Sequence, residues 1–368
     1  MTMAIKTLPA RNAGPRTAPV PTRLRWLKAA LVAAALALWG GPLHADTAVT
    51  LHEIPTAKAF AVAVATDSRG DVWFVESSAN KLGVFRRATE SFEEFDIPTS
   101  RSLPVDIAVD ADDVVWFVEQ DANQIGSYDP RTGKFDEYEI PTPYSQPYRL
   151  AIDRRGRIWF TQFQAGKIGL FDPATKRFRE YDIPSRGSQP MGITVLDSGL
   201  VWFVQAYTNK IASLDPETGR FEEHEIIIPL AVPSTLVKDG EGRLWFGARK
   251  DRKLVSFDPS DGSFKTYDLP GKRLPEGLAV DASGSVWYCD FYGGKIGRLH
   301  VPTATFTELD LPGSGKPFAA AMDGEGRLWF TEVLLNRIGV VDTAHFGGKK
   351  GDKLEIRLGV GEKKLLGR

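Results

Sequence analysis

The sequence predicts an all-β protein, a seven-bladed β-propeller with four antiparallel strands in each blade. The first observation is a tryptophan that recurs at intervals of 43, 43, 43, 43, 42 and 42 residues, at Trp73, Trp116, Trp159, Trp202, Trp245, Trp287 and Trp329. The second is an Ile-Pro or Leu-Pro pair of the same period, which begins at Ile54, Ile97, Ile140, Ile183, Ile228, Leu269 and Leu311. A repeat in the low forties with one aromatic strand per unit is typical of a propeller with one blade per repeat.

Residues 1–45 lie outside the repeat and are predicted to be a signal peptide. They hold six Lys or Arg and no Asp or Glu, and an apolar run from Ala29 to Trp39 precedes Leu43-His44-Ala45, which resembles a cleavage site. The run is shorter than the roughly 20 residues of a transmembrane helix, so no stable membrane span is expected after cleavage. An uncleaved membrane anchor is the alternative. We therefore expect a periplasmic or secreted protein.

The chain that follows the leader is acidic. Without the six basic residues of the leader, 40 Lys and Arg stand against 47 Asp and Glu, a net charge of about −7. This balance argues against nucleic acid as a partner. The single cysteine, Cys289, excludes an intramolecular disulfide and occupies a position where other repeats have small residues, which indicates core packing. We expect a monomer.

Each repeat divides into four strands, as the second repeat shows. Pro104 to Val109 is an apolar strand that should line the central channel, and Val114 to Glu119 holds the tryptophan. Gln124 to Tyr128 and Lys134 to Ile140 follow, and the last of them alternates apolar and charged residues, as an outer strand with one wet face should. Asp and Gly residues between the first two strands recur in most repeats and are interpreted as turn formers, not ligands.

The propeller is expected to span residues 46–342 and to close through its N-terminus. The chain starts with a lone outer strand, Thr50 to Ile54, continues with six full units, and ends with three strands through Val341. The N-terminal strand is therefore predicted to complete the seventh blade, which removes two free sheet edges. The tail, residues 343–368, contains an alternating segment, Lys353 to Leu358, that could compete for this place or add one extra strand outside it.

A binding site is expected at the mouth of the central channel, where one loop from each blade converges. Because strand direction alternates, the start of each inner strand and the end of each tryptophan strand lie on this face. The inner strands are predicted to start 11 residues before the tryptophan, and side chains that break the repeat there are the strongest candidates. The candidate ligand-binding residues at the mouth are Asp106, Tyr148, Arg149, Ser234, Thr235, Glu276 and Phe318.

A second set of mouth positions follows each tryptophan by three residues and is rich in carboxylates on one side of the ring. The residues are Glu76, Glu119, Gln162, Gln205, Ala248, Asp290 and Glu332. Of these, Glu76, Asp290 and Glu332 are candidate ligands for a hard cation such as Mg²⁺ or Ca²⁺. Alternatively, one crowded carboxylate has a raised pKa and acts as a general base. A third interpretation is that the recurring Glu serves the loop of its own blade.

The repeats resemble those of the virginiamycin B lyase family. The similarity rests on Leu328-Trp329-Phe330-Thr331-Glu332, on Asn80-Lys81-Leu82-Gly83 and its counterparts, and on strand starts such as Pro190-Met191-Gly192-Ile193. It covers all seven repeats and implies a seven-bladed propeller and a Mg²⁺-dependent lyase that opens a cyclic depsipeptide by β-elimination at its ester. The family's catalytic base is a histidine at the start of the seventh inner strand, helped by a second histidine in blade six. Here Phe318 and Glu276 occupy these two positions.

Three classes of function follow from these observations. The first is a noncatalytic propeller that binds a small molecule, a peptide or a partner protein at its mouth. The second is a metal-assisted C–O lyase with a displaced base, for which Glu276 is the candidate, and a cation held by Glu332, Glu76 or Asp290. The third is a metal-dependent lactone hydrolase. Because phenylalanine cannot accept a proton, the first class is favoured.

Overall fold

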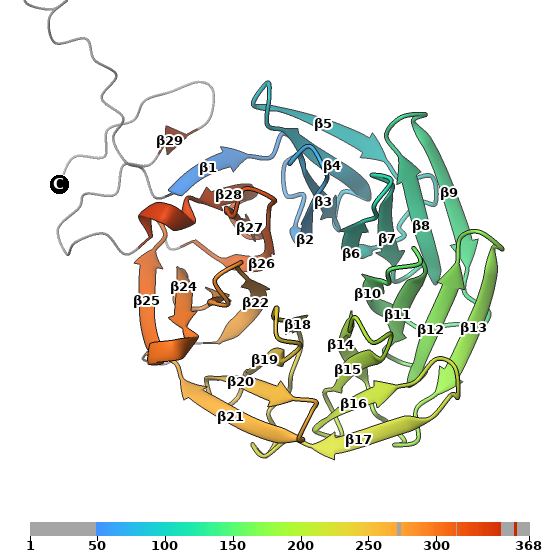
Figure 1. The fold of residues 1–368 in the computed structure, drawn as a ribbon. Helices are drawn as coiled ribbons and strands as arrows, with labels where there is room; N and C mark the ends of the chain where they lie inside the picture. Colours follow the sequence, from blue (N-terminus) through green and yellow to red (C-terminus); the bar gives the residue numbers. More distant parts are fainter. Residues whose placement is uncertain (1–48, 271–273, 314, 347–356, 359–368) are drawn as a thin grey trace, which may run out of the picture. The chain divides into compact units, whose positions relative to one another are not determined.

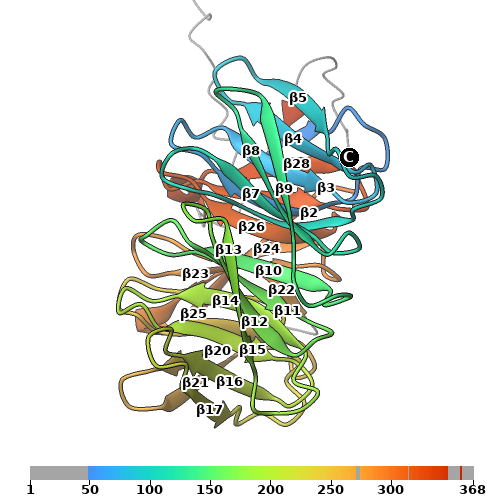
Figure 2. The same cartoon turned by 90° about the vertical axis from the view of Figure 1, so that its right-hand side faces the viewer.

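The computed structural model describes residues 49–270, 274–313, 315–346 and 357–358, and these form seven β-sheets around a central axis (Figure 1). Neighbouring inner strands contact each other all the way round, and the last, β26, contacts the first, β2. The predicted seven-bladed propeller with four antiparallel strands per blade is thereby confirmed. Figure 2 shows the blades from the side. No helix in the described ranges is long and apolar enough to cross a membrane.

The strands take the same order in every blade, from the axis outwards. The inner strands are β2 (Ala61–Thr66), β6 (Pro104–Val109), β10 (Pro147–Ile152), β14 (Pro190–Val195), β18 (Leu236–Lys238), β22 (Pro275–Val280) and β26 (Pro317–Met322). The tryptophan strands are β3 (Val72–Glu76), β7 (Val115–Glu119), β11 (Ile158–Gln162), β15 (Val201–Gln205), β19 (Leu244–Ala248), β23 (Val286–Asp290) and β27 (Leu328–Glu332). The third strands are β4 (Lys81–Arg86), β8 (Gln124–Asp129), β12 (Lys167–Asp172), β16 (Lys210–Leu214), β20 (Lys253–Asp258), β24 (Lys295–His300) and β28 (Arg337–Val341). The outer strands are β5 (Ser91–Asp96), β9 (Lys134–Glu139), β13 (Arg177–Asp182), β17 (Phe221–Glu225), β21 (Ser263–Asp268), β25 (Thr305–Asp310) and, in blade seven, β1 (Val49–Glu53).

Strand β1 closes the ring. It pairs antiparallel with β28 in blade seven, so the N-terminal strand takes the outer place, as predicted. The tail contributes a two-residue strand, β29 (Arg357–Leu358), which pairs parallel with the other edge of β1 and so adds outside the blade instead of competing for it. The predicted leader and most of the tail lie outside the described residues.

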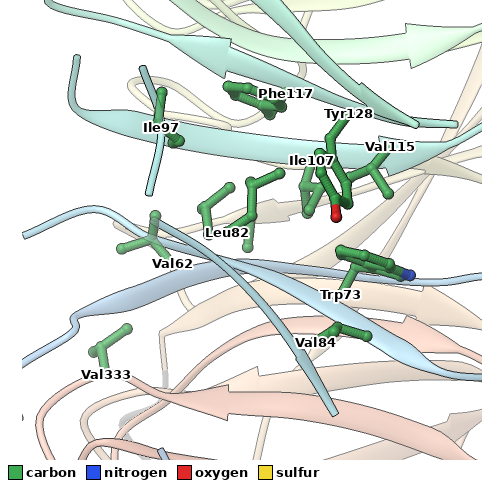
Figure 3. Close-up of a cluster of buried hydrophobic side chains, with 12 residues drawn as sticks. Val62, Trp73, Leu82, Val84, Ile97, Ile107, Val115, Phe117, Tyr128 and Val333 are labelled. Atoms are coloured by element: carbon green, nitrogen blue, oxygen red, sulfur yellow. The ribbon is translucent and has the colours of Figure 1, made fainter. Parts of the chain in front are cut away.

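The recurring tryptophans fill the interfaces between blades. Trp73 packs in one cluster with Val84 of its own blade and with Ile107, Val115 and Tyr128 of blade two (Figure 3). Burial of such large side chains contributes the greater part of the stability of a fold with no disulfide.

The aspartate at the turn between the inner strand and the tryptophan strand accepts a hydrogen bond from the tryptophan. In blade one, the Trp73 Nε1–H donates to Asp67 Oδ2 at 3.1 Å, while the other oxygen of Asp67 accepts backbone amides of the turn. The same bond recurs in blades two, three, five, six and seven. These aspartates are turn formers, as predicted, and they also satisfy a buried donor. In blade four, Leu196 stands in this place and the buried Trp202 Nε1 has no partner within the described part of the chain.

The inner strands begin one residue before the position counted from the tryptophan, although the strand predicted in the second repeat, Pro104 to Val109, is observed with those bounds as β6. Six of the seven inner strands start 12 residues before the tryptophan, and in each a bulge or irregularity follows that first residue. A bulge re-aims the side chains next to it, and here these are the mouth residues. Blade five differs, since β18 has three residues and Ser234 and Thr235 precede it instead of starting it.

Candidate functional site

The mouth residues line a cavity of about 330 Å³ on the axis of the propeller. All seven inner segments contribute to its wall, and so do all of the candidate ligand-binding residues: Asp106, Tyr148, Arg149, Ser234, Thr235, Glu276 and Phe318. The inner strands that carry most of them surround the axis in Figure 1. The volume lies at the lower end of the range for small-molecule sites, roughly 300–1,000 Å³.

An ion pair between blades two and three, in which the side chains of Arg149 and Asp106 are 16% and 14% exposed, forms one side of the cavity. The Arg149 Nη1 donates to Asp106 Oδ1 at 3.0 Å and to the Val105 carbonyl at 3.1 Å, and the Leu150 amide donates to Asp106 Oδ2 at 2.8 Å. The guanidinium lies over the Tyr148 ring, with Cζ at 4.9 Å from the ring centre. Burial acts to lower the pKa of Arg149, but the charge and hydrogen bond of Asp106 together with the charges of Tyr148 and Glu276 outweigh it and raise the pKa, so the arginine stays protonated.

A second ion pair lies on the other side, between blades five and six. The Arg249 Nη2 donates to Glu276 Oε1 at 2.7 Å, and the Thr235 hydroxyl donates to the Glu276 carbonyl at 2.8 Å. Glu276 is 7% exposed. Burial raises the pKa of its carboxyl, while Arg249 and Arg149 act in the opposite direction. The channel therefore holds two acids and two arginines in matched pairs instead of a cluster of acids.

A smaller apolar hollow of about 280 Å³ adjoins the cavity and shares Tyr148, Arg149 and Phe318 with it. The rest of its lining comes from the mouth side of blades one and two: Phe60, Val62, Ser77, Ser78, Leu103 and Val105. The ring of Phe318 meets that of Phe291 edge-on at 6.1 Å. Counting from the tryptophans did not single out this hollow, because Phe60 and Leu103 belong to the loops before the inner strands. Their positive φ angles of 58° and 51° mark them as special positions only once the structure is known.

The mouth face is also where apolar side chains reach solvent. The large hydrophobic residues exposed in the described chain all lie in the loops before inner strands or in the turns after tryptophan strands, which open on this face: Phe60, Tyr144, Tyr207, Ile227, Leu230, Val232, Tyr292, Leu334 and Leu335. Grouped exposure of this kind is typical of a face that meets another molecule.

The three candidate metal ligands lie in three different blades and are each fully buried. Glu332 is bound to Arg337 at 2.6 Å, and Asp290 accepts the Gly293 amide at 2.8 Å. Glu76 lies against Glu94 of its own blade. None of the three lines the cavity, and the described residues contain no group of three His, Cys, Asp or Glu that could hold a metal ion. The arrangement thus does not fit the Mg²⁺ that the resemblance implies, and Mg²⁺ binding stays a prediction.

In blades one to four, the residue at the end of the tryptophan strand faces a glutamate on the outer strand. The Gln162 amide donates to Glu180 at 2.9 Å in blade three, and Gln205 donates to Glu223 at 2.8 Å in blade four. Glu76 and Glu119 take the place of the glutamines in blades one and two. Burial, and then the charge of the outer-strand glutamate, raises the pKa of each to about 8.

A protonated Glu76 or Glu119 can donate to the outer-strand glutamate as the glutamine amide does, whereas an ionised one cannot. Both side chains are fully buried, and of the two only Glu119 has a neighbouring hydroxyl donor, that of Ser102. Glu94 is held ionised, since the Thr56 hydroxyl and amide and the Lys81 ammonium outweigh the effect of burial and lower its pKa. Glu76 and Glu119 therefore interact with the outer strands of their own blades and not with a ligand at the mouth.

No histidine in the described chain lines either cavity. His52 packs on β1 against Phe85 and Trp329, and His224 stacks on Trp202 from the outer strand of blade four. Cys289 is fully buried, with burial raising the pKa of its thiol, and its Sγ lies 3.6 Å from the Ala319 carbonyl oxygen. In the cavity, burial raises the pKa of two carboxyls, those of Asp106 and Glu276.

Comparison with known proteins decides the family. The profile of the virginiamycin B lyase family matches residues 40–200 and 154–346, which together span the propeller. The chain belongs to the virginiamycin B lyase family. No curated protein matches it.

Solved structures agree with this membership of the virginiamycin B lyase family. A streptogramin B lyase is 27% identical with a TM-score of 0.76, over 80% of this chain and 97% of that one. A virginiamycin B lyase from Staphylococcus aureus is 26% identical with a TM-score of 0.75, over 79% and 98%. A catalytically inactive histidine-to-alanine variant of that enzyme with quinupristin is also 26% identical, with a TM-score of 0.73, over 79% of this chain and 98% of that one. The extracellular domain of a putative hybrid two-component system from B. thetaiotaomicron, at 18% identity and a TM-score of 0.62, shares the fold.

Proposed function

We propose that this propeller binds a small molecule, a peptide or a segment of a partner protein at the mouth of its channel, without the histidine-based lyase reaction. The observation that supports this most is the polar cavity on the axis, whose two ion pairs come from residues that break the repeat. Ion pairs that are largely removed from water recover little of the free energy that desolvation costs, so these two partly buried pairs are weak devices for stability alone. The apolar mouth face around it offers further contact area.

The experiment is a thermal-shift screen with a library of di- and tripeptides and with quinupristin. A ligand that binds the folded channel raises the melting temperature, and the rise grows with the ratio of the ligand concentration to its Kd. The unmodified protein and an Arg154→Gln variant should respond alike, because the Arg154–Asp197 pair at 2.7 Å is exposed and does not line the cavity. Arg249→Gln should lose the response. The proposal fails if no probe raises the melting temperature, or if Arg249→Gln responds like the unmodified protein.

A second candidate is a C–O lyase in which Glu276 replaces the histidine base. It is favoured by one observation: the carboxyl of Glu276 lines the cavity and burial raises its pKa, as a general base near neutral pH requires. Arg249 would then orient the carboxylate and stabilise negative charge that develops on the substrate. This reaction would give a linear product from a cyclic ester, and it would be lost in Glu276→Gln. Assays with and without Mg²⁺ test whether a cation contributes.

We also infer that residues 1–45 direct export and that the mature protein is a periplasmic or secreted monomer. The basic, acid-free leader and its apolar run support this inference. Intact-mass analysis of the protein from a periplasmic extract should give a chain that starts at Asp46, and light scattering should give the mass of one chain. A retained leader in the membrane fraction would contradict it.

A further inference from the structure

We propose that the ligand of the channel carries a carboxylate next to an apolar group, and that Arg149 binds this carboxylate through its Nε–Nη2 edge. The inference rests on the proposed function and names the chemistry of the ligand.

The first step is that Arg149 is held in place by one nitrogen alone. Its Nη1 donates both hydrogens, to Asp106 and to the Val105 carbonyl, and its plane lies over the Tyr148 ring. The backbone amide of the same residue donates to the Thr161 hydroxyl at 3.1 Å. A guanidinium fixed in this way loses little conformational freedom when it binds a ligand.

The second step is that the other edge of the guanidinium has no protein partner. A guanidinium has five N–H donors, and the three on Nε and Nη2 bond to nothing in the described chain although Arg149 is only 16% exposed. This edge presents two parallel donors, the geometry that a carboxylate accepts in bidentate fashion. Arg149 lines both the polar cavity and the apolar hollow, so a group bound there can reach into either.

The third step is a second donor in the same cavity. Ser234 is 5% exposed, lines the cavity, and its hydroxyl has no partner in the described chain. A hydroxyl that is accessible from the cavity and has no protein partner can donate a hydrogen bond to a ligand there, for example to a carboxylate oxygen.

The fourth step concerns the rest of the ligand. The acids of the cavity are already paired, since both oxygens of Asp106 accept bonds and Glu276 is bound by Arg249, so they do not repel an incoming anion as free carboxylates would. The hollow beyond Arg149 is walled by Phe60, Leu103 and Phe318. An aromatic or aliphatic group fits this wall, whether it belongs to a free organic acid or to the last residue of a peptide.

The test compares an acid with its amide on the full chain. Calorimetry with N-acetyl-phenylalanine, N-acetyl-phenylalaninamide, 3-phenylpropanoate and a peptide that ends in Phe should show the acids binding at least tenfold more tightly than the amide. Tight binding of 3-phenylpropanoate would identify free acids as sufficient, and binding by the peptide alone would identify a chain terminus as the source; either result supports the carboxylate. Equal affinity for acid and amide would overturn this inference and leave the proposed function standing.

Variants separate the role of the edge from that of fold stability. Arg149→Gln should abolish the preference for the acid. The matched control is Arg179→Gln, since Arg179 also lies over a tyrosine, at 4.6 Å from Tyr181, but on an outer strand. Ser234→Ala leaves the ion pair intact and should lower the affinity for the acids several-fold. This variant keeps the test decisive if Arg149→Gln fails to fold. If neither acid nor amide binds, the inference is wrong, and the proposed function fails with it only if the wider screen is also negative.

Discussion

Replacing Glu76 and Glu119 by glutamine should make the protein more stable at neutral and alkaline pH. Both carboxyls are fully buried against an outer-strand glutamate and have a pKa of about 8 instead of the usual 4.5. Gln162 and Gln205 show that glutamine fits the same place in blades three and four and donates to the same partner.

The direction follows from proton binding by the folded and unfolded chains. Below pH 4.5 both chains carry the proton, so the carboxyls do not affect stability. As the pH rises from 4.5 to 8 the unfolded chain releases its protons while the folded chain keeps them, so the free energy of unfolding falls. With roughly 1.4 kcal/mol per pKa unit, the loss between pH 5 and pH 8 is about 3 kcal/mol for each carboxyl.

The assay is urea denaturation between pH 5 and pH 9. The difference between the double variant and the unmodified protein should grow with pH to several kcal/mol, and other titrating groups cancel in this difference. The reverse change, Gln162→Glu, creates a third such pair and should steepen the fall. Parallel curves for the unmodified protein and the double variant would refute the reasoning, because they would mean that Glu76 and Glu119 are ionised in the folded state.

Further changes test the fold and its closure. Asp239→Ala removes the acceptor of the Trp245 indole, of Arg243 and of two turn amides, and should lower the free energy of unfolding by about 2–4 kcal/mol in chemical denaturation. The control Asp258→Ala, at an exposed turn, should lower it by less than about 1 kcal/mol. Similar losses in the two variants would contradict the role of the indole bond. A chain that starts at Thr56 lacks β1 with its fully buried Val49 and Leu51 and should lose about 3–6 kcal/mol or fail to fold, so an unchanged melting temperature would show that β1 does not close the ring. Gly83→Val should be strongly destabilising, because a Cβ there would lie 2.2 Å from the Phe74 ring; unchanged denaturation would contradict this packing.

The fold could be predicted because each blade repeats the same solution to the same packing problem. The tryptophan between blades, the aspartate that accepts its N–H and the glycine beneath the neighbouring phenylalanine each recur in most repeats, so spacing alone located the strands to within about a residue. The start of β18 was missed, since Ser234 and Thr235 stand where the other blades begin their inner strand. The tryptophan spacing does not show this departure, because Trp202 and Trp245 are 43 residues apart, as in the earlier repeats.

The site could be predicted only in part, for a geometric reason. Counting placed the inner-strand residues at the mouth, where the bulge turns them into the cavity, and repeat-breaking residues such as Arg149 stood out. Counting also placed Glu119 at the mouth, but its side chain faces into its own blade. Phe117 and Glu119 are two residues apart and share one face of the strand, and Gly126 lies beneath both: a Cβ there would be 2.2 Å from the Phe117 ring and 2.9 Å from Glu119 Oε1. The partner that raises its pKa is on the outer strand, which spacing cannot show.

We propose that the channel has exchanged the family's histidine chemistry for a binding site. The most direct test of this claim is to incubate the purified protein with quinupristin and Mg²⁺ and to follow the compound by liquid chromatography and mass spectrometry. We expect the cyclic compound to disappear no faster than in the protein-free control. Phe318 cannot accept a proton, and the carboxylate of Glu276 is already bound by Arg249. A linear product that forms with the unmodified protein and disappears with Glu276→Gln would contradict this claim.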